Sequence, residues 1–260
     1  LLERGLVGRP AGVDPLVGLG VVQQQRRLDA RYLLGLRLPA IEGHGGAKVA
    51  TARSVATAAD GSVYVLADLT DGSSTSDIKG ARDVALLKYD SAGKLAFSEI
   101  LGAAQSASGF ALAVSADGKV AVAGSVEGVL SGTSAKGGTD SFVAMFDASG
   151  KELWTARRGA SANDEALAIA FAPDGSVFVM AYADRSLRVH AASGSELLHT
   201  LRLPEPETEA LRGATELTIT FAPAGDRFLV TSNTGAAALF DTASGRVLAS
   251  RGSSENVAPA

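Results

Sequence analysis

The chain has 260 residues, of which 46% are apolar and 20% charged, and its formal net charge is −4. This composition indicates a globular protein with a substantial core, as one domain or two smaller ones, rather than a disordered chain. The scattered charges exclude the concentrated basic face of nucleic-acid-binding proteins, the lack of cysteine excludes disulfides and thiolate metal sites, and no apolar run approaches the roughly 18 residues of a membrane helix.

Residues 1–30 do not share the pattern of the rest of the chain, and we expect them to form a partly helical arm. Asp14 followed by Pro15 is typical of a helix start, because Asp is a good N-cap and Pro suits the first helical position. The apolar residues that follow recur at helical spacing, which predicts a short packing helix near 15–29. Since the chain begins at Leu1 rather than Met, we expect that a signal peptide or an upstream domain can precede it.

Residues 31–39 are predicted to be a strand separated from the rest of its sheet. The segment Arg31-Tyr-Leu-Leu-Gly-Leu-Arg-Leu-Pro39 ends like Leu197-Leu-His-Thr-Leu-Arg-Leu-Pro204. The second of these segments is the fourth strand of the repeat described next. By this match, residues 31–39 are the fourth strand of a unit whose first three strands are not nearby in sequence.

From residue 50 onward the chain repeats a unit of four short apolar strands joined by alternating tight and loose turns, and Ser108–Gly159 shows it most clearly. Asp-Gly turns at Asp60, Asp117 and Asp174 recur at a period of about 57 residues, and Gly225-Asp226 replaces them in the last unit. Four antiparallel strands per unit at a fixed period are typical of propeller blades. The predicted first strands are 53–58, 110–114, 166–171 and 217–221; the second are 63–67, 120–124, 177–181 and 227–231; the third are 84–89, 142–146, 187–190 and 236–240; the fourth are 94–100, 151–156, 196–203 and 246–250.

We therefore predict an all-β fold, a β-propeller of four-stranded antiparallel blades over residues 31–252, followed by a flexible tail at 253–260. The second strands are nearly continuous apolar runs, as expected for strands buried on both faces. Four blades are recognisable, plus the orphan outer strand 31–39, so fourth strands outnumber first strands. An open ring would expose the apolar faces of its end blades. The chain is accordingly expected to be part of a larger ring or assembly and not a free-standing monomer.

Two segments carry a resemblance to a known family. Val84-Ala-Leu-Leu-Lys-Tyr-Asp-Ser-Ala-Gly-Lys94 and Asp140-Ser-Phe-Val-Ala-Met-Phe-Asp-Ala-Ser-Gly-Lys-Glu-Leu-Trp154 resemble the bacterial β-propeller repeat (SBBP-type) family. Residues 186–252 are similar to shorter WD40- or quinoprotein-like blades. The resemblance implies an exported or cell-surface bacterial scaffold, in some cases associated with flagella, and a cytoplasmic location stays open. Propellers host many unrelated functions, so the resemblance specifies the fold more than the activity.

The two faces of the predicted propeller differ. All the tight turns open on one face, which we call the tight-turn face, and the long loops open on the other, the long-loop face. The predicted long loops are 68–82, 101–109, 125–140, 157–165 and 204–214. Because function usually lies on loops held by a rigid frame, we expect the long-loop face to bind a protein partner or further copies of the chain. The candidate partner contacts are Arg157 and Arg158, expected to begin an exposed loop, and the acidic loop residues Glu205, Glu207 and Glu209.

Candidates for a metal or cofactor are weak. Aspartates in or beside the first long loop offer oxygen ligands for calcium, but their spacing differs from that of a calcium loop and favours solvated turns: Asp68, Asp71, Asp77 and Asp83. The three histidines are too scattered for a convincing metal site and are predicted to be structural: His44, His190 and His199. Trp154 resembles the docking tryptophan of quinoprotein propellers, but as the sole tryptophan it is expected to pack between blades. No cofactor is predicted.

The leading hypothesis for function is a non-enzymatic scaffold or protein-interaction module, without catalytic residues. The alternative is a quinoprotein-like or hydrolytic enzyme that uses the axial funnel. Such an enzyme needs titratable groups where the first strands begin. The chain offers a sparse set there: Arg53, Phe110, Glu165, Ala166 and Glu216. A structural subunit of a filament or envelope assembly is the third possibility.

Overall fold

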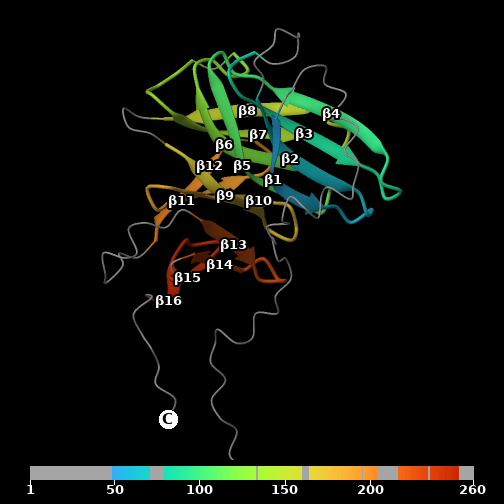
Figure 1. The fold of residues 1–260 in the computed structure, drawn as a ribbon. Coiled ribbons are helices and arrows are strands. Elements are labelled where there is room, and N and C mark those ends of the chain that lie inside the picture. Colours follow the sequence, from blue (N-terminus) through green and yellow to red (C-terminus); the bar gives the residue numbers. More distant parts are fainter. Residues whose placement is uncertain are drawn as a thin grey trace, which may run out of the picture.

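The computed structural model describes residues 49–70, 79–132, 134–159, 164–194, 196–203, 216–233 and 235–251. These residues form sixteen strands in four four-stranded antiparallel sheets, and each sheet contains four strands in chain order (Figure 1). The described part of the chain contains no helix. The predicted all-β propeller and its four four-stranded blades are confirmed, whereas the predictions for 1–30, 31–39 and 253–260 lie outside the described residues.

We number the blades I to IV along the chain. Blade I contains β1 (Val49–Thr57), β2 (Val63–Thr70), β3 (Asp83–Tyr89) and β4 (Leu95–Leu101). Blade II contains β5 (Ser106–Val114), β6 (Val120–Glu127), β7 (Asp140–Phe146) and β8 (Glu152–Arg158). Blade III contains β9 (Ala166–Phe171), β10 (Val177–Tyr182), β11 (Ser186–Ala191) and β12 (Leu197–Arg202). Blade IV contains β13 (Leu217–Phe221), β14 (Arg227–Ser232), β15 (Ala237–Asp241) and β16 (Val247–Arg251).

The first strands of blades I and II begin four residues earlier than the sequence predicts. In both strands the register shifts, between Ala52 and Ser54 in β1 and between Gly109 and Ala111 in β5. A bulge of this kind places two residues opposite one and reverses the alternation of side chains. The apolar alternation therefore breaks at the bulge, and pattern reading ends the strand there although pairing continues.

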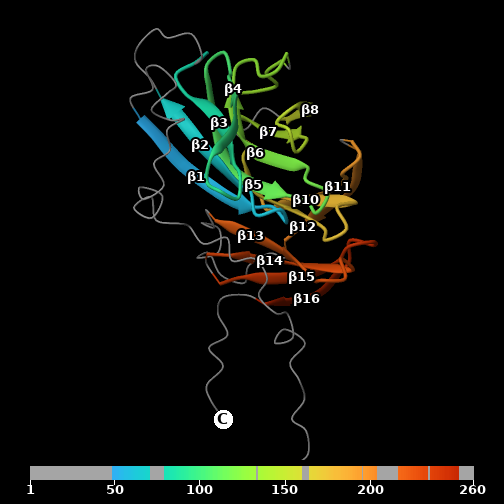
Figure 2. The same ribbon diagram turned by 90° about the vertical axis from the view of Figure 1, so that its right-hand side faces the viewer.

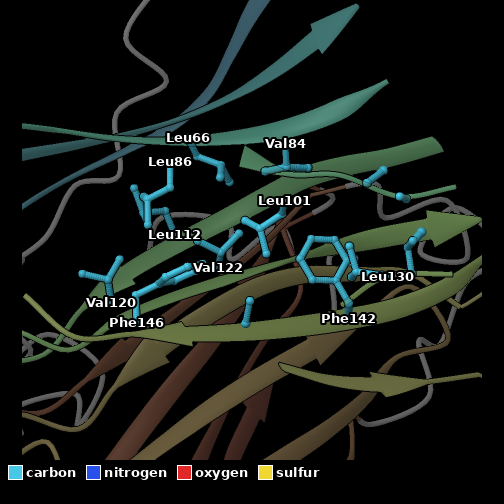
Figure 3. Packing of buried hydrophobic residues seen from close by; sticks show 14 of the residues in the cluster. Leu66, Val84, Leu86, Leu101, Leu112, Val120, Val122, Leu130, Phe142 and Phe146 are labelled. Atoms are coloured by element: carbon cyan, nitrogen blue, oxygen red, sulfur yellow. The ribbon is translucent and has the colours of Figure 1, made fainter. Parts of the chain in front are cut away.

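Neighbouring blades stack through apolar faces. The first strands pack in the order β1, β5, β9 and β13, and Figures 1 and 2 show the four sheets following one another in chain order, from blue to red. Between blades I and II, Leu66 and Leu86 point toward Leu112 (Figure 3) in a cluster whose members are almost fully buried. Between blades II and III, the rings of Trp154 and Phe178 lie 6.0 Å apart, which confirms the predicted packing role of Trp154.

A fourth apolar cluster belongs to blade I alone. Its buried members come from β2 and β3 and are at most 6% exposed: Val65, Ala67, Leu69, Ala85, Leu87 and Tyr89. They alternate with Tyr64 and Leu66, which face blade II, so both faces of blade I are apolar. Within the described strands, no packing comparable to that of β5 on β9 joins β13 to β1. None of the other three described blades therefore contributes a buried residue to this second face of blade I.

The close approach of β5 and β6 gives a test of the fold. A Cβ atom at Gly124 would lie 1.9 Å from the carbonyl oxygen of Ser108, and backbone cannot move aside as a side chain can. We expect Gly124→Ala to lower the free energy of unfolding by about 1–3 kcal/mol, as overpacking does. Gly194→Ala is the matched control, because a Cβ atom there meets nothing within 4 Å. Equal urea midpoints for both variants would contradict the described pairing of β5 with β6.

Candidate functional site: the long-loop face

The tight-turn face is closed by short hairpins that use their own aspartates. In the first of them, Ala58 N–H donates to Ser62 O at 2.9 Å, and Ser62 N–H donates to Asp60 Oδ1 at 2.9 Å. Hydrogen bonds from the neighbouring serine hold the pKa of the turn carboxyls below the usual range in four such turns: Asp60, Asp147, Asp174 and Asp241. These carboxylates stabilise turns, which leaves this face with little polar chemistry of its own.

On the long-loop face, three segments from blades I and II are hydrogen-bonded into one layer. We call residues 79–83, 102–106 and 128–130 the loop platform. Ala81 N–H donates to Gln105 O at 2.7 Å, and Ala104 N–H donates to Val129 O at 2.9 Å. Arg82 also pairs with Ser106 in an isolated bridge, as Ala103 does with Leu130. These three segments are thus fixed to one another as well as to the strands.

Two buried aspartates fix the loops that lead into the third strands. Asp83 and Asp140 stand one repeat period apart at the first residue of β3 and β7, and neither is exposed to solvent. Lys79 N–H donates to Asp83 Oδ2 at 2.6 Å, and Lys136 N–H donates to Asp140 Oδ2 at 2.8 Å. Sequence reasoning missed this pair as a unit, although the repeated Lys-Gly-x-x-Asp pattern at 79–83 and 136–140 was the signal.

Arg157 does not lie in an exposed loop, and that prediction is wrong. It belongs to β8, because the ladder with β7 continues through the pairs Phe142–Arg157 and Ser141–Arg158. Its side chain is 1% exposed, and its Nε lies 2.5 Å from Asp140 Oδ2. The same guanidinium donates to the carbonyl oxygens of Val126 and Gly128. Arg157 therefore joins the loop platform to the core and cannot meet a partner.

Asp83 has no such cation. The position in blade I that corresponds to Arg157 is Ile100, and the carboxylate of Asp83 instead accepts from Lys79 N–H and from Ala103 N–H at 3.2 Å. Burial raises the pKa of Asp83 above its usual value in spite of these hydrogen bonds. The two equivalent aspartates thus differ, since of the two only Asp140 forms an ion pair within the described residues.

Asp68, the first of the calcium candidates, is also engaged. Its Oδ2 lies 2.8 Å from Arg53 Nε and 2.7 Å from Arg53 Nη2, and its Oδ1 accepts from Gly109 N–H of blade II at 2.9 Å. Both carboxylate oxygens thereby fix the junction of blades I and II. Asp71 and Asp77 lie outside the described residues, so a calcium site stays a prediction. Among the residues that are described, no group of three His, Asp or Glu side chains is placed to hold a metal ion.

The connections between second and third strands on the long-loop face differ between the blades, and they are long only in blades I and II. In blades III and IV the second and third strands are joined by short turns, with Arg185 N–H donating to Tyr182 O and Gly235 N–H to Ser232 O. The predicted long loop 101–109 is also wrong, because β4 and β5 are separated only by residues 102–105. Glu205, Glu207 and Glu209 lie outside the described residues.

Arg158, next to Arg157 but on the opposite face of β8, is half-buried between blades II and III. Burial and the positive charge of Arg188 lower its pKa. The guanidinium carbon of Arg188 lies 5.5 Å from the ring centroid of Tyr182. A role of Arg158 in partner binding stays a prediction.

Two of the predicted structural histidines are described. His190 is 2% exposed, and its ring stacks on Phe178 with 5.1 Å between centroids. His199 Nε2 lies 2.8 Å from Ala243 O. Both contacts lie within or between blades, as a structural role requires, and His44 is outside the described residues.

Comparison with known proteins identifies one relative by sequence and one solved structure with a similar fold. Regulatory protein FlaEY of Caulobacter vibrioides is 49% identical over 145 residues, which are 50% of this chain and 15% of that protein. The chain thus matches only a small part of that relative's length. The β-propeller domain of Cps50 (Swd1) from Myceliophteria thermophila superposes with a TM-score of 0.51 at 14% identity, over 78% of this chain and 55% of that one.

No protein-family model matches the chain, so the SBBP-type resemblance stays a prediction. The solved propeller domain shows the fold alone at this level of identity, and nearly half of it has no counterpart in the match. In the part of the chain that the structure describes, no helix is long and apolar enough to cross a membrane.

Alanine substitutions of the two adjacent arginines of β8 are expected to differ in their effect on stability. Arg157→Ala leaves Asp140 buried without its cation, which we expect to lower the free energy of unfolding by about 3–5 kcal/mol. Arg158→Ala is the matched control and should change it by less than about 1 kcal/mol, as at other sites without a partner. Urea unfolding followed by circular dichroism measures both. Similar losses in the two variants would show that Arg157 is not the residue that holds Asp140.

Asp83 gives an expectation for pH. Because its pKa is raised in the folded state, that state holds the proton more tightly than the unfolded chain does between the usual Asp value and the raised one. The contribution of Asp83 to stability therefore falls as pH rises through this window. Asp83→Asn removes that dependence, at the constant cost of an altered hydrogen bond. Urea unfolding in acid and at neutral pH should show that the free energy of unfolding of Asp83→Asn increases relative to that of the wild type as pH rises. An increase of this difference with falling pH would contradict the raised pKa.

Proposed function

We propose that this chain is a non-enzymatic propeller scaffold that presents its long-loop face to a protein partner within a flagellum-associated regulatory assembly of a bacterium. The observation that carries the proposal is the contrast between the two faces. One face consists of minimal hairpins, whereas the other carries loops hydrogen-bonded into the loop platform. Ordered loops on a rigid frame present a preformed surface, which lowers the entropic cost of binding a partner.

The relative gives the direction of the proposal. FlaEY is named a regulatory protein, and half of this chain is 49% identical to part of it. The name describes the whole relative, of which this chain matches 15%. We therefore carry over only a regulatory or scaffolding role related to flagella, and we take the partner to be a protein or a further copy of the chain. The extracytoplasmic or cell-surface location rests on the SBBP-type resemblance and belongs to the same proposal.

The charged residues described so far are engaged in ion pairs and hydrogen bonds, which favours a scaffold over an enzyme that uses the axial funnel. Arg53, at the start of the first strand of blade I, is held by Asp68. The buried carboxylates of Asp83 and Asp140 accept hydrogen bonds from backbone N–H groups, and Asp140 is ion-paired as well. A catalytic acid or base needs a free reactive atom within reach of a substrate. Each of these residues has a structural task instead.

Charge reversal on the two faces tests the proposal. Lys79 and Lys136 are exposed and repeat-equivalent on the long-loop face, and only their backbone N–H groups cap the aspartates, so Lys79→Glu/Lys136→Glu should leave the fold intact. We expect at least a tenfold loss of the partner captured from an extract of the natural host. Lys119→Glu/Lys151→Glu, on the tight-turn face, is the charge-matched control. Loss of the partner in the control but not on the long-loop face would overturn the proposal.

A further inference from the structure

At the junction of blades II and III, the positive charges of two arginines from different blades act on one tyrosine. Arg158 is the last residue of β8, Tyr182 ends β10, and Arg188 lies in β11. The guanidinium carbon of Arg188 lies 5.5 Å from the centroid of the Tyr182 ring. The positive charges of both arginines act on the Tyr182 hydroxyl, whose pKa burial raises to about 12. All three side chains lie toward the long-loop end of their strands.

Neither Arg158 nor Arg188 forms an ion pair with a carboxylate within the described residues, and Arg188 Nε is buried without a hydrogen-bond acceptor. The Tyr182 hydroxyl has only the sulfur of Met180, at 3.7 Å. Two carboxylates lie close enough to act on Tyr182, those of Asp164 and Asp184. The latter accepts from Ser186 N–H at 2.8 Å and from Ser186 Oγ at 2.5 Å.

Arg157, the neighbour of Arg158 in β8, is an arginine whose guanidinium group has hydrogen-bond acceptors. Arg157 donates to Asp140 and to two carbonyl oxygens. Burying a charged donor without an acceptor is unfavourable, and placing a second positive charge beside it adds repulsion. Buried polar groups without partners are uncommon in folded proteins and call for an explanation, of which a missing ion is one. Two guanidinium groups and a hydroxyl in one neighbourhood offer the kinds of donor that bind an oxyanion.

We propose that Arg158, Arg188 and the Tyr182 hydroxyl form a binding site for an oxyanion, namely the carboxylate of an acidic segment of the protein partner. The inference rests on the proposed scaffold function and names the chemistry of its partner. A carboxylate accepts two parallel hydrogen bonds from one guanidinium, and the second arginine neutralises the remaining charge. The net charge of the chain is −4, so attraction of an acidic ligand requires a local site such as this one.

Fluorescence anisotropy with a fluorescein-labelled hexaglutamate peptide tests the site directly. We expect Arg158→Gln and Arg188→Gln each to weaken binding at least tenfold, which corresponds to about 1.4 kcal/mol. Arg246→Gln is the matched control, since Arg246 is exposed and follows a turn of the tight-turn face. Inorganic phosphate forms the second arm as a competitor. Absence of peptide binding, an equal loss in the control, or binding of phosphate without the peptide would overturn the proposal.

Thermal unfolding supplies a readout that a structural role would not give. If the arginines await an anion, removing either positive charge should leave the melting temperature of the free chain unchanged or raised, and 10 mM phosphate should stabilise the wild type more than the variants. A clear drop in melting temperature for both variants would show that the arginines are structural. Capture of the natural partner by both variants would refute this site and leave the scaffold role intact, whereas capture by no form of the chain would refute the scaffold role.

Discussion

The structure depends on covering both faces of each four-stranded sheet with apolar side chains. Three of the four clusters do so by joining neighbouring blades, and their members are almost completely buried. The chain has no cysteine with which to form disulfides, so blade stacking supplies the main stabilisation of the frame. The stacking of blades in chain order also brings the loop segments of blades I and II together on the long-loop face.

Ion pairs and hydrogen bonds of charged residues then connect this frame to the loops. Arg53 and Asp68 connect β1 to β2 and reach Gly109 of the next blade, while Arg157 and Asp140 connect β8 to β7 and to residues 126–128. In the interior, removing one partner of such an ion pair is strongly destabilising, because it leaves a buried charge without compensation. Arg158 and Arg188 form no ion pair within the described residues, and Arg188 Nε is buried without an acceptor, which is why they are of functional interest.

Much of the fold could be predicted from sequence, because strand periodicity and Asp-Gly turns are local signals. The strands and tight turns of all four blades follow from them, as with Asp60 and Asp117. The bulges at Ala52 and Gly109 could not be predicted, since a reversal of alternation looks like the end of a strand. The different burial and partners of the adjacent Arg157 and Arg158 could not be predicted either. The partner of Arg157 is seventeen residues away in sequence and is brought close only by the β7–β8 ladder.

The second apolar face of blade I bears on the prediction that the four described blades are part of a larger ring or assembly. Val65 and Leu87 on that face are buried, yet none of the other described blades supplies a buried residue to their cluster. Multi-angle light scattering on purified residues 1–260 at micromolar concentration tests this most directly. The account predicts a mass at a multiple of 26.3 kDa, or aggregation. A single stable species of 26.3 kDa would contradict it.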